Sequence, residues 1–182
     1  MNYEVITLAV SIILGIIGYL ITYFINLRIS QRNDRLNRVN RQLGELYGPL
    51  FAISQSTDRT WKAFRKKYRS IRRDNKDGDP YSEEELSIWR LWMCTIFMPN
   101  NLRMYELILK NSDLLIESEM PQCLLDFCAH VTAYQIVIKR WENNDFSEHT
   151  SVVDYPTIDI IEYIQSSYIS LKITQSKLLG KR

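Results

Sequence analysis

The beginning of the chain contains one long apolar run. Between Val5 and Leu27 there are 23 consecutive residues without Asp, Glu, Lys or Arg. As a helix that rises about 1.5 Å per residue, this run is roughly 34 Å long, slightly more than the ~30 Å hydrocarbon core of a bilayer. No basic side chain precedes it and no small-residue cleavage site follows it, which argues against a signal peptide. The pattern therefore predicts a retained transmembrane helix, with residues 1–27 as the anchor.

An apolar stripe continues through residues 28–50, where the charged residues begin. Its members follow the three- and four-residue steps of a heptad repeat, and Arg and Asn take the outer positions. The stripe consists of Ile29, Leu36, Val39, Leu43, Leu46 and Leu50. It predicts a juxtamembrane helical stalk that holds an oligomer together. Gly48 and Pro49 should kink or end this helix, because proline disfavours helical geometry in the residue before it.

Residues 51–182 repeat the spacing of amphipathic helices. Ser82 and Glu85 predict a capping box at the start of one helix, and the Pro99-Asn100-Asn101 stretch should interrupt it. An irregular stretch, residues 143–156, precedes the last helix, and no segment shows the alternation of a strand. The predicted fold class is all-α: an N-terminal single transmembrane helix that continues into a cytoplasmic helical bundle, with residues 51–182 as the cytoplasmic domain.

Charge is distributed unevenly along the chain. Residues 28–76 hold 14 Lys and Arg against 4 Asp and Glu, whereas residues 77–182 hold 9 against 16. Basic residues beside a membrane span favour the cytoplasm, so the N-terminus should lie outside and the C-terminal domain inside. The basic segment indicates attraction to anionic lipids, with nucleic acid or an acidic protein as the alternative. The basic surface expected beyond the stalk consists of Lys62, Arg65, Lys66, Arg69 and Arg73.

Small and polar residues follow one face of the predicted span. They recur every three or four residues, which keeps them within one ~100° sector of the helix. The stripe consists of Thr7, Ser11, Gly15, Gly18, Thr22 and Asn26. Small residues let membrane helices approach closely, and their polar groups can bond a neighbour or face water. Unless it reflects only the abundance of Gly, Ser and Thr in such helices, the stripe predicts self-association around a lumen or by helix packing.

The sequence contains few groups with catalytic or metal-binding spacing. The three cysteines, Cys94, Cys123 and Cys128, lie in apolar helical stretches, where a free cysteine is usually a small core residue. Cys128 and His130 lack a second Cys/His pair at ligand spacing, so no metal site is predicted. There is no phosphate loop, HExxH or nucleophile elbow, and we expect no cofactor and no small-molecule substrate.

The overall architecture is similar to that of a known family. The relevant stretches are LNRVNRQLGELYGPL at 36–50 and CAHVTAYQIVIKRWENNDFSEHTSV at 128–152, in a chain with one span and a short helical body. The chain resembles the membrane accessory proteins encoded beside the RNA-guided, RNA-cleaving effector of type VI-B CRISPR systems. The resemblance implies a homo-oligomeric pore in the bacterial inner membrane that depolarises the infected cell and enhances antiviral defence. The implied partners are an RNA-guided CRISPR effector or RNA.

The same resemblance implies a divergent form of HEPN, a helical nuclease fold. Members of that nuclease class carry Arg, four to six residues and then His, and the pair polarises RNA for metal-independent cleavage. The nearest match here is Arg140 and His149, separated by eight residues of which several are irregular. Arg140 is more simply a cation at a helix C-terminus, where the macrodipole favours it. We therefore expect no enzyme, with a membrane-tethered HEPN-type RNase or an inactive adaptor that binds RNA or an acidic partner as alternatives.

Overall fold

The computed structural model describes residues 3–68 and 81–180, and within them every regular element is a helix. This confirms the predicted all-α class. In chain order the elements are α1 (Tyr3–Arg41), the π-helical turn η1 (Gln42–Tyr47), α2 (Gly48–Tyr68), α3 (Glu83–Trp92), the π-helical turn η3 (Met93–Phe97), α4 (Met98–Lys110), the 3₁₀ turn η4 (Ser112–Leu114), α5 (Gln122–Glu142) and α6 (Thr157–Leu178).

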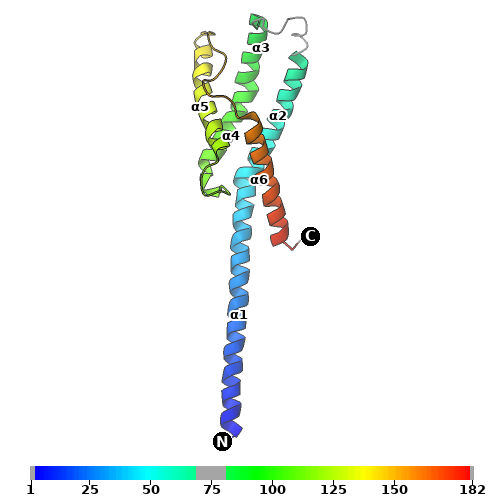
Figure 1. The fold of residues 1–182 in the computed structure, drawn as a ribbon, viewed down its shortest axis with the longest axis vertical. Coiled ribbons are helices and arrows are strands. Elements are labelled where there is room, and N and C mark those ends of the chain that lie inside the picture. The colour runs from blue at the N-terminus through cyan, green and yellow to red at the C-terminus, as the bar shows by residue number, and fades with distance from the viewer. Residues whose placement is uncertain (1–2, 69–80, 181–182) are drawn as a thin grey trace.

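Most of α1 stands clear of the rest of the protein as a long rod (Figure 1). Every side chain from Ile6 to Arg35 is exposed. In the described part of the chain, this is the one helix that is long and apolar enough to cross a bilayer. The apolar N-terminal helix is thus present as expected, and nothing within the protomer covers it.

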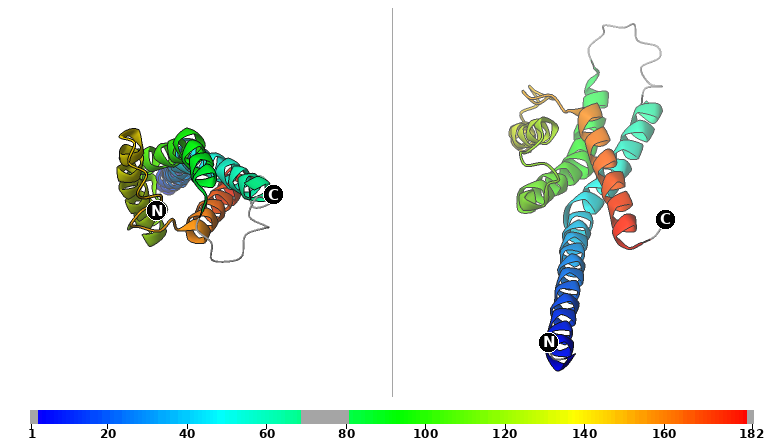
Figure 2. Two further views of the ribbon diagram at one scale, coloured as in Figure 1. Left: turned by 90° about the horizontal axis from the view of Figure 1, so that it is seen from above. Right: turned by 60° about the horizontal axis from the view of Figure 1, so that its bottom comes forward.

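The other helices pack around one core at the far end of α1, and α6 runs back beside the end of that helix (Figure 2). Val39, Leu46 and Leu50 belong to this core, with at most 5% of each residue exposed. The last turns of the predicted stalk are therefore part of the helical domain. The structure places the change from free rod to packed domain before Val39 rather than after Leu50.

Two prolines lie within continuous helical segments rather than at breaks. The π-helical turns η1 and η3 each end two residues before a proline, Pro49 and Pro99. A proline ring clashes with the carbonyl four residues earlier, and a wider π turn relieves that crowding. At the first site α2 leans away from the axis of α1, as a kink would require (Figure 1). The predicted interruption at Pro99 is wrong, because η3 carries the chain into α4 without a loop.

Two other local predictions agree with the structure. The Ser82 Oγ atom accepts from the Glu85 backbone N–H at 3.2 Å, and the Glu85 carboxylate accepts from the Ser82 N–H at 2.8 Å. This is the expected capping box at the start of α3. The stretch between α5 and α6, residues 143–156, contains no regular element.

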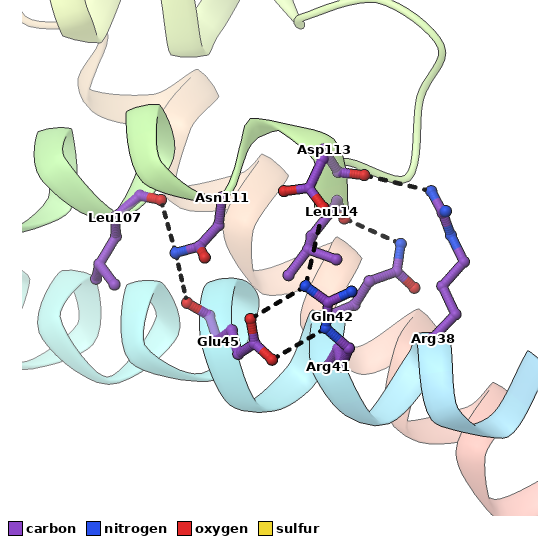
Figure 3. A network of polar contacts seen from close by, with 8 residues as sticks. All are labelled: Arg38, Arg41, Gln42, Glu45, Leu107, Asn111, Asp113 and Leu114. Carbon is purple, nitrogen blue, oxygen red and sulfur yellow. Dashed lines mark hydrogen bonds and ion pairs between the residues drawn. The ribbon is translucent and has the colours of Figure 1, made fainter.

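A polar network joins the end of α1 and η1 to the connection between α4 and α5 (Figure 3). Gln42 is 5% exposed, and its side-chain amide donates to the Leu114 carbonyl at 3.0 Å. Arg41 pairs with Glu45 at 3.1 Å and lies 3.9 Å from the Asp113 carboxylate. The rod is therefore connected to the domain by a buried hydrogen bond as well as by apolar packing.

The C-terminal end of α6 is attached to α1 by a second set of contacts. The Arg32 guanidinium donates to the Leu178 carbonyl, with its Nε atom at 2.7 Å. Gln175 donates to the Asn40 side chain at 2.7 Å. Arg32 thus supplies a donor and a positive charge at the end of α6, where helix carbonyls lack partners and the macrodipole favours a cation.

Candidate functional site

A cavity of about 280 Å³ lies where α2, α3, η3, α4, α5, α6 and the 149–155 loop meet. Part of its wall is aromatic, contributed by Trp61, Trp89, Phe97, Tyr134 and Tyr155. Two carboxylate residues, Asp58 and Asp154, also line it. No Lys or Arg is present among the described residues that line the cavity. The lining is therefore largely aromatic, and of its two carboxylates that of Asp58 is paired with Lys62 at 2.5 Å.

The loop over this cavity is held by side chains of α3 and α5. The His149 carbonyl accepts from Tyr134 Oη at 2.8 Å and from Trp89 Nε1 at 3.4 Å. Trp141 Nε1 donates to the Glu148 carbonyl at 2.8 Å. These aromatic side chains satisfy backbone acceptors of an irregular segment, which would otherwise need water. Burial raises the pKa of Tyr134, so its hydroxyl remains a donor.

His130 also forms a hydrogen bond to the 149–155 loop. Its Nδ1 atom lies 2.6 Å from the Val153 carbonyl, and because a carbonyl only accepts, Nδ1 carries the proton. Burial lowers the pKa of His130, although the bond to Val153 and the charge of Asp154 act in the opposite direction. The neutral ring therefore keeps Nε2 as an acceptor. Burial also raises the pKa of Tyr155, whose ring packs edge-on against His130, to about 12.

His149 is paired with an arginine, but not with the one that the sequence suggested. Arg90 NH1 lies 2.9 Å from His149 Nε2, so the imidazole accepts there and its own proton is on Nδ1. Burial first, and then the charge of Arg90, lowers the pKa of His149. Arg90 also pairs with Glu83 and lies over the Phe146 ring, 4.2 Å from its centre.

Arg140, the other predicted catalytic residue, has different partners. Its guanidinium lies 3.4 Å from Ser147 Oγ, 3.4 Å from the Glu148 carboxylate and 3.9 Å from that of Asp145. Among the described residues no hydrogen bond joins Arg140 to His149, although Arg140 pairs with the neighbouring Glu148. Arg140 lies in the last turn of α5, in agreement with its simpler interpretation as a helix C-terminal cation.

The small-residue stripe forms one exposed face of α1. Its three hydroxyl groups, those of Thr7, Ser11 and Thr22, each donate to the carbonyl four residues earlier at 2.9 Å. A Cβ atom added at Gly15 or Gly18 would meet nothing within 4 Å. Asn26 is exposed on the same helix. The hydroxyl donors of this face thus need no water, and the glycine positions leave room for a close neighbour.

The predicted stalk residues fall into two groups. Val39 and Leu46 are buried in the core of the protomer, and Leu43 packs partly against it. Leu36 is half-buried, and Ile29 is 52% exposed. Ile29 is therefore the stalk position most open to a second copy.

The predicted basic surface is described only in part. Lys62 lies 2.5 Å from the Asp58 carboxylate, and the Arg65 guanidinium lies 5.9 Å from the centre of the Trp61 ring. Lys66 is exposed. Arg69 and Arg73 lie outside the described residues. Three of the five basic side chains thus lie on α2, two of them engaged with residues that line the cavity.

Asn101 and Asp58 are cavity residues that sequence reasoning missed. Asn101 is 4% exposed, and its Oδ1 atom has no hydrogen-bond partner among the described residues. A signal was present in the sequence, because Asn101 falls on the same helical stripe as the buried Met104 and Ile108. A polar residue on an apolar stripe is unusual unless it has a partner.

No group of His, Cys, Asp and Glu side chains in the described part of the chain could hold a metal ion. Cys94, Cys123 and Cys128 are free, and burial raises the pKa of each thiol. A raised pKa leaves these cysteines as weakly nucleophilic thiols.

Comparisons with protein-family models, curated protein sequences and solved structures gave no match to this chain.

Proposed function

We propose that this protein is a homo-oligomeric membrane effector whose N-terminal helix crosses a bacterial inner membrane and associates with other copies to form a pore. The observation that carries the proposal is the bare rod of α1. Its apolar side chains are exposed, with Leu14 at 63% and Phe24 at 56%. An apolar surface of this length is unfavourable in water, so lipid or other helices must cover it.

The small-residue face supports association of α1 helices rather than a solitary anchor. Its three hydroxyl groups already donate within the helix, so they can enter the bilayer without losing a hydrogen bond. The glycines would let a neighbouring backbone approach closely. The remaining lone pairs and the Asn26 amide could equally face water in a narrow lumen. We favour the lumen, because the stripe is more polar than helix packing requires.

The basic residues that follow the apolar run support a membrane orientation with the helical domain on the cytoplasmic side. Arg28, Arg32 and Arg35 are exposed immediately after the apolar run. Basic residues at this position favour the cytoplasmic side and attract anionic lipids. The helical domain would then lie in the cytoplasm and the N-terminus outside. The resemblance to type VI-B accessory proteins adds antiviral defence as the setting in which such a pore acts.

Ion flux in liposomes and the mass of the purified protein in detergent test the proposal together, with Gly18→Leu as the decisive variant. In a lumen, Leu should narrow and dewet the path, lowering flux while the oligomer keeps its mass. At a helix contact, Leu should separate the backbones and dissociate the oligomer. Ala9→Leu is the matched control, because Ala9 lies on the opposite face of the helix, and it should change neither quantity. A Gly18→Leu protein that keeps the mass and flux of the parent would contradict both roles.

A membrane-tethered ribonuclease is the alternative that the resemblance suggests. It would need Arg140 and His149 to act on one phosphodiester, yet these residues bind different partners. A double Arg140→Ala, His149→Ala variant separates the two functions. A pore should retain ion flux if the domain remains folded, whereas a ribonuclease should lose RNA cleavage.

A further inference from the structure

The C-terminal end of α6 lies close to the point where α1 would leave the membrane. Arg32 donates to the Leu178 carbonyl, so the last turn of α6 is level with Arg32 on α1 (Figure 1). Arg32 is five residues beyond Leu27, where the apolar run ends, which is about 7.5 Å along a helix. The headgroup layer outside the ~30 Å hydrocarbon core is roughly 5–8 Å thick on each side. In the orientation proposed above, the end of α6 therefore reaches the headgroup layer.

Basic side chains gather at this level of the protein. From Tyr163 to Gly180 the sequence contains two lysines, Lys172 and Lys177, and no Asp or Glu. On α1, residues 28–35 contain three arginines and one acidic residue, Asp34. All five cationic side chains are exposed, and none of them forms an ion pair with a carboxylate among the described residues. Their positive charge is therefore free to attract an anionic surface.

The same end of α6 also exposes apolar side chains. Ile173 is 50% exposed and Leu179 is 46% exposed, whereas Leu171 belongs to the buried face of the helix. At 100° per residue, Lys172 and Lys177 lie on either side of Ile173. Lysines that flank exposed apolar residues are typical of helices at a membrane surface, where the alkyl stems cover apolar groups and the ammonium groups reach the headgroups. A nucleic acid would account for the lysines but not for the exposed apolar side chains.

The last turn of α6 is also arranged so that it can face negative charge. A helix C-terminus carries a partial negative charge and carbonyls without partners, which an anionic surface would repel. Here Arg32 donates to the Leu178 carbonyl and adds a full positive charge. Gly180, at a φ of 73°, donates its N–H to the Lys177 carbonyl at 3.1 Å. The repulsion expected at this helix end is thus offset by the residues around it.

We propose that the C-terminal end of α6 binds anionic phospholipid headgroups of the cytoplasmic leaflet and so holds the helical domain against the membrane. This inference rests on the proposed membrane crossing of α1, but it does not require a pore. Lys177 and the arginines of α1 contact the lipid phosphates, and Leu179 lies among the headgroups. The domain then has a second attachment to the membrane, 146 positions along the chain from Arg32.

Hydrogen–deuterium exchange of the full-length protein in lipid nanodiscs tests this, with phosphatidylcholine discs compared with discs that contain phosphatidylglycerol. The backbone amides of residues 176–180 should exchange at least about fivefold more slowly in the anionic discs, as expected for one lysine held beside an anionic surface. Inorganic phosphate added to phosphatidylcholine discs should not slow the exchange, which distinguishes a lipid surface from a free anion. Equal exchange in the two lipids would overturn the proposal, and slower exchange on addition of RNA would then assign the lysines to nucleic acid.

The decisive variant is Lys177→Glu, with Lys139→Glu as its matched control. Both lysines are exposed and lie in the last turn of a helix, but α5 ends on the side of the domain away from the rod (Figure 1). Lys177→Glu should remove the difference between the two lipids without changing the thermal unfolding temperature. Lys177→Arg and Lys139→Glu should both retain the difference. Loss of the difference in Lys139→Glu as well would indicate a general effect of net charge and contradict the assigned surface.

Failure of this inference can be distinguished from failure of the proposed function. Insertion into phosphatidylcholine discs depends on α1 and tests the membrane crossing by itself. A protein that inserts and conducts ions, but shows no lipid difference at residues 176–180, would keep the proposed function and refute this inference. A protein that shows the lipid difference but conducts no ions would refute the pore and support the membrane contact of α6.

Discussion

At the scale of single residues, particular neighbours allow a proline within a long helix. Pro49 has no N–H to offer the Glu45 carbonyl four residues earlier. Asn111 supplies the missing donor, since its buried amide donates to that carbonyl at 3.0 Å and to the Leu107 carbonyl at 3.1 Å. A side chain 66 positions away from Glu45 thus completes the helix.

Gly48 is the residue that makes the wide turn before Pro49 possible. A Cβ atom there would lie 2.3 Å from the Leu43 carbonyl oxygen, a backbone atom that cannot simply rotate away. We expect Gly48→Ala to destabilise the domain by about 1–3 kcal/mol, as overpacking typically does. Urea unfolding in a fixed detergent measures this. Gly44→Ala, in the same turn but with nothing within 4 Å, should be neutral or stabilising by up to about 1 kcal/mol. Equal stability of the two variants would show that the close approach has no energetic consequence.

At the scale of elements, the junction between α1 and the domain combines buried and exposed contacts of different strength. The hydrogen bond from Gln42 to Leu114 is buried, whereas the contact from Arg38 to the Asp113 carbonyl is exposed and 3.5 Å long. An exposed contact competes with water and contributes little, but a buried acceptor without a partner is costly. The attachment of the rod therefore depends mainly on Gln42 and on the packing of Val39 and Leu46.

Gln42→Leu tests this difference in strength. The variant keeps the apolar bulk but leaves the Leu114 carbonyl without its donor, so the free energy of unfolding should fall by about 1–3 kcal/mol. Arg38→Ala is the control and should change it by less than about 0.5 kcal/mol, as exposed substitutions usually do. Denaturant unfolding followed by tryptophan fluorescence measures both. If Arg38→Ala lowers the free energy of unfolding more than Gln42→Leu does, the exposed contact of Arg38 contributes more to the network in Figure 3 than the buried hydrogen bond of Gln42.

At the scale of the whole molecule, one helix serves two environments. The N-terminal part of α1 is bare and apolar, while its C-terminal turns contribute Val39 to the core of the domain. An assembly of copies therefore cannot use the full heptad stripe as its interface. The positions still open to a second copy lie nearer the proposed membrane, at Ile29 and, in part, at Leu36.

Ile29→Glu should dissociate the proposed oligomer without unfolding the protomer. Its side chain is 52% exposed in the protomer, and like charges brought together in a helical interface repel. We expect a fall in mass in detergent with an unchanged thermal unfolding temperature. Gln31→Glu introduces the same charge on another face and should leave the mass unchanged. An Ile29→Glu protein of parental mass would place the contacts between copies elsewhere.

Much of the fold was predictable because it depends on local pattern. The apolar run of Val5–Leu27, the helical periodicity of the body and the capping box at Ser82 each need only neighbouring residues to specify them. Helical hydrogen bonds connect residues four apart, and caps connect residues three apart. A short segment of the sequence is therefore enough to predict either feature. The sequence by itself therefore determined an all-helical protein with one long apolar helix.

Only the tertiary structure decided what covers each face and which distant groups meet. Periodicity places Val39 and Leu46 on one apolar face of a helix. A protein core and an oligomer interface both require this spacing, so the sequence does not distinguish them. In this protein both residues are buried in the core of the protomer. His149 meets Arg90, 59 positions away, rather than the nearby Arg140, because the packing of α3 against the 149–155 loop outweighs closeness in sequence. The cavity around Asn101 arises for the same reason, since its wall is assembled from five α-helices, the turn η3 and the 149–155 loop, and no short segment contains it.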